Sequence, residues 1–121
     1  MIPAKNFREG REDSYISRYI FAFGEKPVSD GAATDAEDNH YFTDLKNNAI
    51  AVLDILKELK VLVKDDRLLW PDSLSFGPDS WLYIAVNQLH RAARFNNGEE
   101  KAQLPYRIMR VWTGTEGPAG K

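Results

Sequence analysis

The chain has 121 residues, of which 43% are hydrophobic, and a formal net charge of −2 at pH 7. This hydrophobic content argues against disorder and is enough for the core of one domain. The small net charge, with no block of Lys and Arg among aromatic residues, argues against nucleic-acid binding. Because the chain has no cysteine, disulfides and thiolate metal sites are excluded.

No apolar run approaches the roughly 18 residues that a membrane-spanning helix needs, so we expect no membrane partner. Residues 1–8 contain no apolar stretch typical of a secretory signal, so we expect the chain as written to be soluble and not exported. The composition leaves the compartment open.

Residues 1–28 predict a loop followed by a short helix. The polar residues 1–11 are expected to be loose, and a helix is expected to begin at Asp13 or Ser14. The apolar residues that follow have helical spacing: Tyr15, Ile16, Tyr19, Ile20 and Phe23. Gly24 and then Pro27 predict the end of this helix.

Residues 29–121 predict β-structure. Four strands are expected within residues 29–70, at 31–35, 40–44, 49–54 and 60–64. Three more are expected within residues 71–112, at 73–77, 81–86 and 107–112. Residues 113–121 form a tail, so the second set has no fourth strand. The last two strands are separated by an insertion, residues 87–105, and loops of this length are usually functional or mobile.

One segment, residues 47–63, has a competing interpretation. Its apolar residues lie close to a 3.6-residue period, and Asp54 to Lys60 are rich in helix formers. Taken alone, the segment would be an amphipathic helix. The Val-rich ends at 51–53 and 61–63 favour two strands joined by a tight turn, and this is the interpretation we adopt.

A repeat supports the strand assignment. Asp72 lies 42 positions after Asp30, and Tyr83 lies 42 positions after Tyr41, since 72 − 30 and 83 − 41 both equal 42. A repeat of roughly 40–45 residues with several short strands is typical of one blade of a β-propeller. The predicted fold is therefore all-β: two propeller blades, the second incomplete, after a short N-terminal helix.

Five residues are candidates for ligand binding, and four of them, all but Asn87, have a structural alternative. Asp30 and Asp72 occupy equivalent places where the innermost strand of each repeat begins, but either could simply close a turn. Trp70 is a candidate for stacking on a ligand or for the core. Asn87 and His90 follow a strand, and His90 has no nucleophile or carboxylate nearby in the sequence.

Five motifs in register resemble the C-terminal portion of the major royal jelly protein/Yellow family. They span about residues 12 to 112 and are Lys26-Pro27-Val28-Ser29-Asp30-Gly31; Tyr41-Phe42-Thr43-Asp44-Leu45 with Asn48-Ala49-Ile50; Leu69-Trp70-Pro71-Asp72-Ser73-Leu74; Trp81-Leu82-Tyr83 with Asn87-Gln88-Leu89-His90; and Tyr106-Arg107-Ile108-Met109-Arg110. The chain differs from the family at Asp38, Ser73 and Ser80, where glycine is favoured and where a positive φ is often required.

The resemblance implies a six-bladed β-propeller of which this chain is about the last third, with four blades before it. It further implies a small-molecule site in the central channel, an extracellular or periplasmic location, and for some insect relatives a link to dopachrome conversion. Alone, the chain is expected to be a fragment without activity of its own. We also expect it to self-associate, because its last strand and its outer faces lack partners.

The related gluconolactonase-like propellers suggest an alternative, a metal-dependent lactone hydrolase. In those proteins an Asp in a context similar to that of Asp72 coordinates a divalent metal, with Glu and Asn ligands from other blades. By this resemblance Asp72 is the candidate metal ligand, and Ca²⁺ or another divalent cation is the candidate cofactor of the complete propeller. The chain itself contains no nucleophile motif or phosphate-binding loop.

Overall fold

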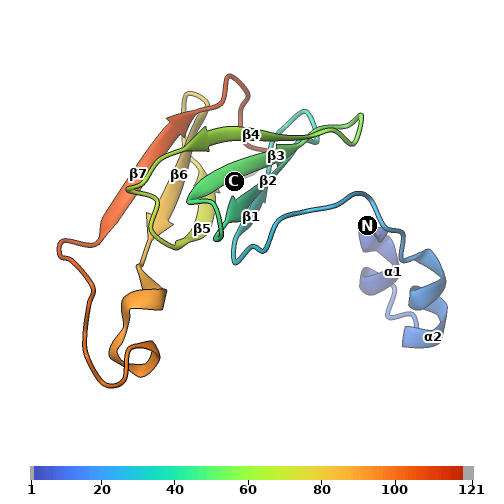
Figure 1. The fold of residues 1–121 in the computed structure, drawn as a ribbon. Helices are drawn as coiled ribbons and strands as arrows, with labels where there is room; N and C mark the ends of the chain where they lie inside the picture. Colours follow the sequence, from blue (N-terminus) through green and yellow to red (C-terminus); the bar gives the residue numbers. More distant parts are fainter. Residues whose placement is uncertain (1, 119–121) are drawn as a thin grey trace.

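The computed structural model describes residues 2–118, so positions 119–121 of the predicted tail lie outside the described residues. Two antiparallel sheets, of four and three strands, contain most of the regular structure, and helices are few and short. This confirms the predicted all-β class. Figure 1 shows the two sheets packed face to face, with α1 and α2 set apart from them. None of the helices in residues 2–118 is long and apolar enough to cross a membrane.

The first sheet has the strand order β1-β2-β3-β4, with β1 at Ala32–Thr34, β2 at His40–Asp44, β3 at Ala49–Leu53 and β4 at Leu59–Lys64. The alternative helix over residues 47–63 is therefore wrong. The reason lies in the β3–β4 turn, where the Asp54 carboxylate accepts hydrogen bonds of 2.9 Å from the N–H groups of both Leu56 and Glu58. Pairing of β3 with strands on both sides adds to this and overrides local helix propensity.

The second sheet has the order β5-β6-β7, with β5 at Pro71–Phe76, β6 at Trp81–Val86 and β7 at Arg107–Trp112. The insertion between β6 and β7 contains two short 3₁₀ helices, η2 at Leu89–Arg91 and η3 at Ala93–Phe95. Among residues 2–118, no strand pairs with the outer edge of β7.

The sequence repeat is reproduced in strand register. Ala33 pairs with Tyr41 in the first sheet, and Ser75 pairs with Tyr83 in the second; both residues are shifted by 42 positions. The hairpin turns also correspond, since the N–H of Asp35 donates to the carbonyl of Asn39 as that of Gly77 donates to Trp81. The two hairpins are therefore structural copies.

The core lies between the two sheets. Its buried residues are Tyr41, Ile50, Leu68, Leu82, Ile84 and Val86. The ring of Tyr41 meets that of Phe76 edge-on, with centroids 5.3 Å apart. At the inner strands the backbones approach closely, because a Cβ on Gly31 would collide with the carbonyl oxygen of Asp72. On the second sheet the open face carries Tyr83 and Ala85, which alternate with the buried residues of β6.

The N-terminal region differs from the prediction. Residues 2–11 are not uniformly loose, since α1 covers Ala4–Arg8, while Met1 of the predicted loop lies outside the described residues. The predicted helix begins at Asp13 as expected, but only Asp13–Ile16 is α-helix, α2, and it is followed by the 3₁₀ turn η1 at Ser17–Tyr19. Phe23 leaves the helical path and packs edge-on against His40 at 5.0 Å, and Gly24 lies against Leu53. Phe23 thus packs on the face of the first sheet that points away from the second sheet. This packing overrides the helix that the apolar spacing predicts.

Candidate functional site

The five candidate residues gather at one end of the two sheets. Asp30 lies just before β1, Trp70 immediately precedes β5, and Asn87 and His90 follow β6. Asp72 is the second residue of β5. This arrangement follows from the antiparallel pairing of β5 with β6, which places Pro71 opposite Val86 and so brings the start of one strand beside the end of the other.

Trp70 joins the two sheets at this end. Its indole Nε1 donates a hydrogen bond of 2.6 Å to Oδ2 of Asp30, 40 positions earlier in the chain. Its backbone has φ of 56°, which is unusual for a bulky residue and indicates that the surrounding contacts hold it there. The Trp70 carbonyl also accepts a hydrogen bond of 3.3 Å from the N–H of Asn87.

His90 stacks on Trp70. The two ring centroids are 5.8 Å apart and the ring planes differ by 20°. Burial lowers the pKa of the His90 imidazole, and the positive charge of Arg91 lowers that pKa further. The neutral form of the ring is therefore favoured at neutral pH. The His90 carbonyl accepts a hydrogen bond of 2.9 Å from Nδ2 of Asn96, which fixes the backbone beneath the stack.

The carboxylates of Asp30 and Asp72 have no cationic partner. Among residues 2–118, no ion pair includes either group, and the Asp72 side chain makes no hydrogen bond. In the same part of the chain, no three His, Cys, Asp or Glu side chains lie together as a metal site. Asp72, the residue suggested as a metal ligand, therefore belongs to no group of three such side chains among the described residues.

The two polar side-chain atoms of Asn87 have different roles. Its Oδ1 accepts a hydrogen bond of 2.9 Å from the N–H of Leu89, which closes the turn after β6. Its Nδ2 makes no hydrogen bond within residues 2–118. Asn87 therefore has a donor available to a ligand while its other atom maintains the turn.

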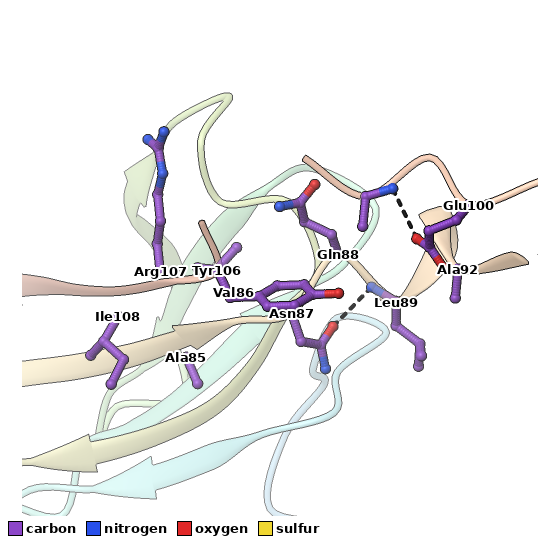
Figure 2. A pocket seen from close by; sticks show the side chains of 11 residues that line it. Ala85, Val86, Asn87, Gln88, Leu89, Ala92, Glu100, Tyr106, Arg107 and Ile108 are labelled. Carbon is purple, nitrogen blue, oxygen red and sulfur yellow. Dashed lines mark hydrogen bonds between the residues drawn. The ribbon is translucent and has the colours of Figure 1, made fainter. Parts of the chain in front are cut away.

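Sequence reasoning missed the pocket next to this cluster. The pocket has a volume of about 570 Å³ and lies between the ends of β6 and β7 and the insertion (Figure 2). Apart from Asn87, none of its lining residues was a candidate; the others include Ala85, Leu89, Tyr106 and Ile108. Most of them lie in or beside the insertion, which is outside the repeat. The length of the insertion was the available signal.

A scan of protein-family models and a search of curated proteins found no match to this chain. The similarity to the royal jelly/Yellow family therefore stays a prediction based on the motifs themselves.

Proposed function

We propose that the two sheets are adjacent blades of a β-propeller of the royal jelly/Yellow type and that the protein is a small-molecule-binding module. The shared register of the two hairpins supports the repeated-blade interpretation, because Ala33–Tyr41 and Ser75–Tyr83 are equivalent pairs. The packing of β5 against β1 and β2 agrees with it, since successive blades of a propeller pack face to face.

The observation that carries the binding proposal is the hydrogen bond from Trp70 to Asp30 together with the stack of Trp70 on His90. Three segments that are distant in the sequence supply these side chains. Residues held in uncommon backbone conformations cluster at ligand sites, and Trp70 is such a residue. Asp30, Trp70 and His90 are therefore better suited to binding a ligand than to filling the core, which lies elsewhere between the sheets.

The charge at this end favours a cationic ligand. Asp30 keeps one oxygen free of the indole hydrogen bond, and Asp72 has no partner among the described residues. An ammonium group can pair with such a carboxylate, and an attached ring can pack against Trp70 and His90. The proposed ligand is therefore a small molecule with a positive charge and a flat apolar part.

The test is an NMR titration of the full chain that follows the indole signals of its three tryptophans. We expect 2-phenylethylamine to shift the Trp70 signal, which the Trp70→Phe variant assigns. The uncharged 2-phenylethanol should bind up to about fivefold more weakly, because an exposed charge pair contributes only about 0.2–1 kcal/mol. The variant Asp30→Asn keeps an oxygen for the indole and should reduce this difference, because only the Asp72 carboxylate then remains to pair with the ammonium group.

Asp38→Asn is the matched control, because Asp38 is an exposed residue of the β1–β2 turn and asparagine also tolerates its φ of 63°. It should leave both affinities unchanged. Equal affinity for the amine and the alcohol in the original chain would contradict the proposal. So would a response confined to the Trp81 and Trp112 signals.

A further inference from the structure

The insertion between β6 and β7, residues 87–105, is ordered by hydrogen bonds and forms one wall of the pocket described above. The buried side chain of Gln88 bridges its two limbs, donating to the carbonyl of Gln103 at 2.7 Å and accepting from the N–H of Gln103 at 3.0 Å. The N–H of Lys101 also donates to the carbonyl of Arg91 at 2.9 Å. The segment was expected to be either functional or mobile, and these bonds tie its ends together.

A carboxylate closes the tip of this wall. Oε2 of Glu100 accepts a hydrogen bond of 3.2 Å from the N–H of Ala93, and its Oε1 accepts one of 3.0 Å from the N–H of Ala102. Both oxygens of Glu100 are thus engaged with the backbone. The charge of Glu100 is therefore used to hold the wall in place.

The pocket beneath the wall is mainly apolar. Ala85 and Ile108 face each other across β6 and β7 on the open side of the second sheet, and Leu89, Ala92 and Ala102 line the insertion side. Figure 2 shows the ring of Tyr106 extending over the pocket toward Leu89, while the guanidinium of Arg107 points away from it. The volume of about 570 Å³ lies within the range of small-molecule sites.

We propose that this pocket binds a compact, neutral, aromatic molecule that carries one hydrogen-bond acceptor, such as a carbonyl oxygen. The apolar lining and the Tyr106 ring suit a flat apolar body. The free Nδ2 of Asn87 is the donor for the acceptor, and its position is fixed because Oδ1 holds the N–H of Leu89. This pocket is distinct from the cation site, since neither Asp30, Trp70 nor His90 lines it.

The experiment is a titration of the ¹⁵N-labelled full chain with acetophenone, followed through the backbone amide signals. We expect shifts at Ala85, Ile108 and residues 87–92, with roughly millimolar affinity for a molecule of this size. Toluene, which lacks the acceptor, should bind about three- to tenfold more weakly, as expected for the loss of one hydrogen bond of about 0.5–1.5 kcal/mol.

Asn87→Asp separates the two functions of the side chain. It keeps an oxygen for the N–H of Leu89 and replaces the free donor by an acceptor, so acetophenone affinity should fall to that of toluene or below while toluene binding stays the same. Ala102→Phe should fill the pocket and remove binding of both probes. Ala4→Phe, on the exposed surface of α1, adds the same side chain elsewhere and should change neither.

Two outcomes would overturn the proposal. One is acetophenone binding that Asn87→Asp leaves unchanged, which would show that the Asn87 donor is not used. The other is a set of shifts spread over β5 and the centre of the open face, with none at residues 87–92. Asn87→Asp preserves the turn, so it tests the proposed hydrogen bond to the ligand even if Ala102→Phe fails to fold.

Discussion

The hydroxyl of Thr115 donates a hydrogen bond of 2.7 Å to the carboxylate of Asp35, although the two residues are 80 positions apart. Asp35 is only 1% exposed and also accepts hydrogen bonds from Glu37, Asn39 and Tyr41. The same C-terminal segment accepts a bond of 2.8 Å at the Glu116 carbonyl from the N–H of Ala36. The segment after β7 is therefore fastened to the β1–β2 turn and links the two sheets.

Thr115→Val tests this link. Valine has nearly the same shape but no hydroxyl, so it leaves the buried Asp35 carboxylate with one donor fewer. We expect the free energy of unfolding to fall by about 1–3 kcal/mol. Thr115→Ser keeps the hydroxyl and should lose less. Chemical denaturation measures both values, and equal losses for the two variants would mean that the hydroxyl contributes nothing.

Stability should fall in acid partly through Asp35. Burial raises the pKa of the Asp35 carboxyl, but hydrogen bonds from Asn39, Thr115 and Tyr41 outweigh it and leave the pKa below its ordinary value of 3.8. A folded-state pKa below the unfolded value stabilises the protein at higher pH, and this contribution is lost as the pH falls through the folded-state pKa.

Asp35→Asn should therefore be less stable than the original chain at pH 6, by about 1–3 kcal/mol. The difference in Tm between the two proteins should shrink as the pH is lowered from 5 toward 2.5, because the unfolded chain then binds a proton at Asp35 more readily than the folded chain does. Thermal unfolding across this pH range is the measurement. A difference that stays constant with pH would show that the charge of Asp35 does not contribute.

Ser80 and Ser73 replace glycines favoured by the family that the motifs resemble, and the structure separates the two positions. Ser80 has φ of 63°, whereas Ser73 lies within β5 and is not among the residues with positive φ. Ser80→Gly should raise stability by about 0.5–1 kcal/mol, since serine pays a steric penalty there. Ser73→Gly should lower stability by a similar amount, because glycine weakens a strand. Denaturation curves would show opposite shifts, and shifts in the same direction would contradict this.

Self-association should occur at micromolar concentration. Tyr83 and Ala85 are the repeat equivalents of Tyr41 and Thr43, which are buried between the sheets, yet among residues 2–118 no further sheet packs on the open face on which they lie. Trp112, which is 62% exposed, also belongs to the unpaired edge strand β7.

Trp112→Lys should reduce the association seen in analytical ultracentrifugation. Leu56→Lys is the control, because Leu56 is also apolar and exposed but lies in the β3–β4 turn, and it should change nothing. A sharp monomer with cooperative thermal unfolding would refute the prediction.

Calcium should bind the chain no more tightly than about millimolar. Asp72 is the candidate ligand, but Ca²⁺ prefers six to eight oxygen ligands, and within residues 2–118 Asp72 belongs to no group of three or more acidic or other metal-ligating side chains. Isothermal titration calorimetry of the chain and of Asp72→Ala tests this. Micromolar binding that Asp72→Ala abolishes would instead favour the metal-dependent hydrolase.

The sequence predicted the strands well where residues alternate and repeat. The predicted bounds of β2, β6 and β7 agree with the structure, and the other strands differ by at most two residues at either end. The predicted N-terminal helix begins where it was expected, at Asp13, but its predicted extent to Phe23 was wrong, because the apolar spacing did not reveal that Phe23 packs on His40. Candidate residues such as Asp30 and Trp70 were found because they stand at strand starts, but their mutual hydrogen bond was not foreseen.

By itself, the sequence determined the all-β class, the 42-residue repeat and the order of the strands, because these depend on alternation, on turn residues and on spacing along the chain. Only the tertiary structure decided which distant side chains meet: Thr115 with Asp35, Trp70 with Asp30 and His90, and the insertion with the end of β6. Such contacts depend on how the two sheets pack and on where the connecting segments close, and neither is encoded in local periodicity.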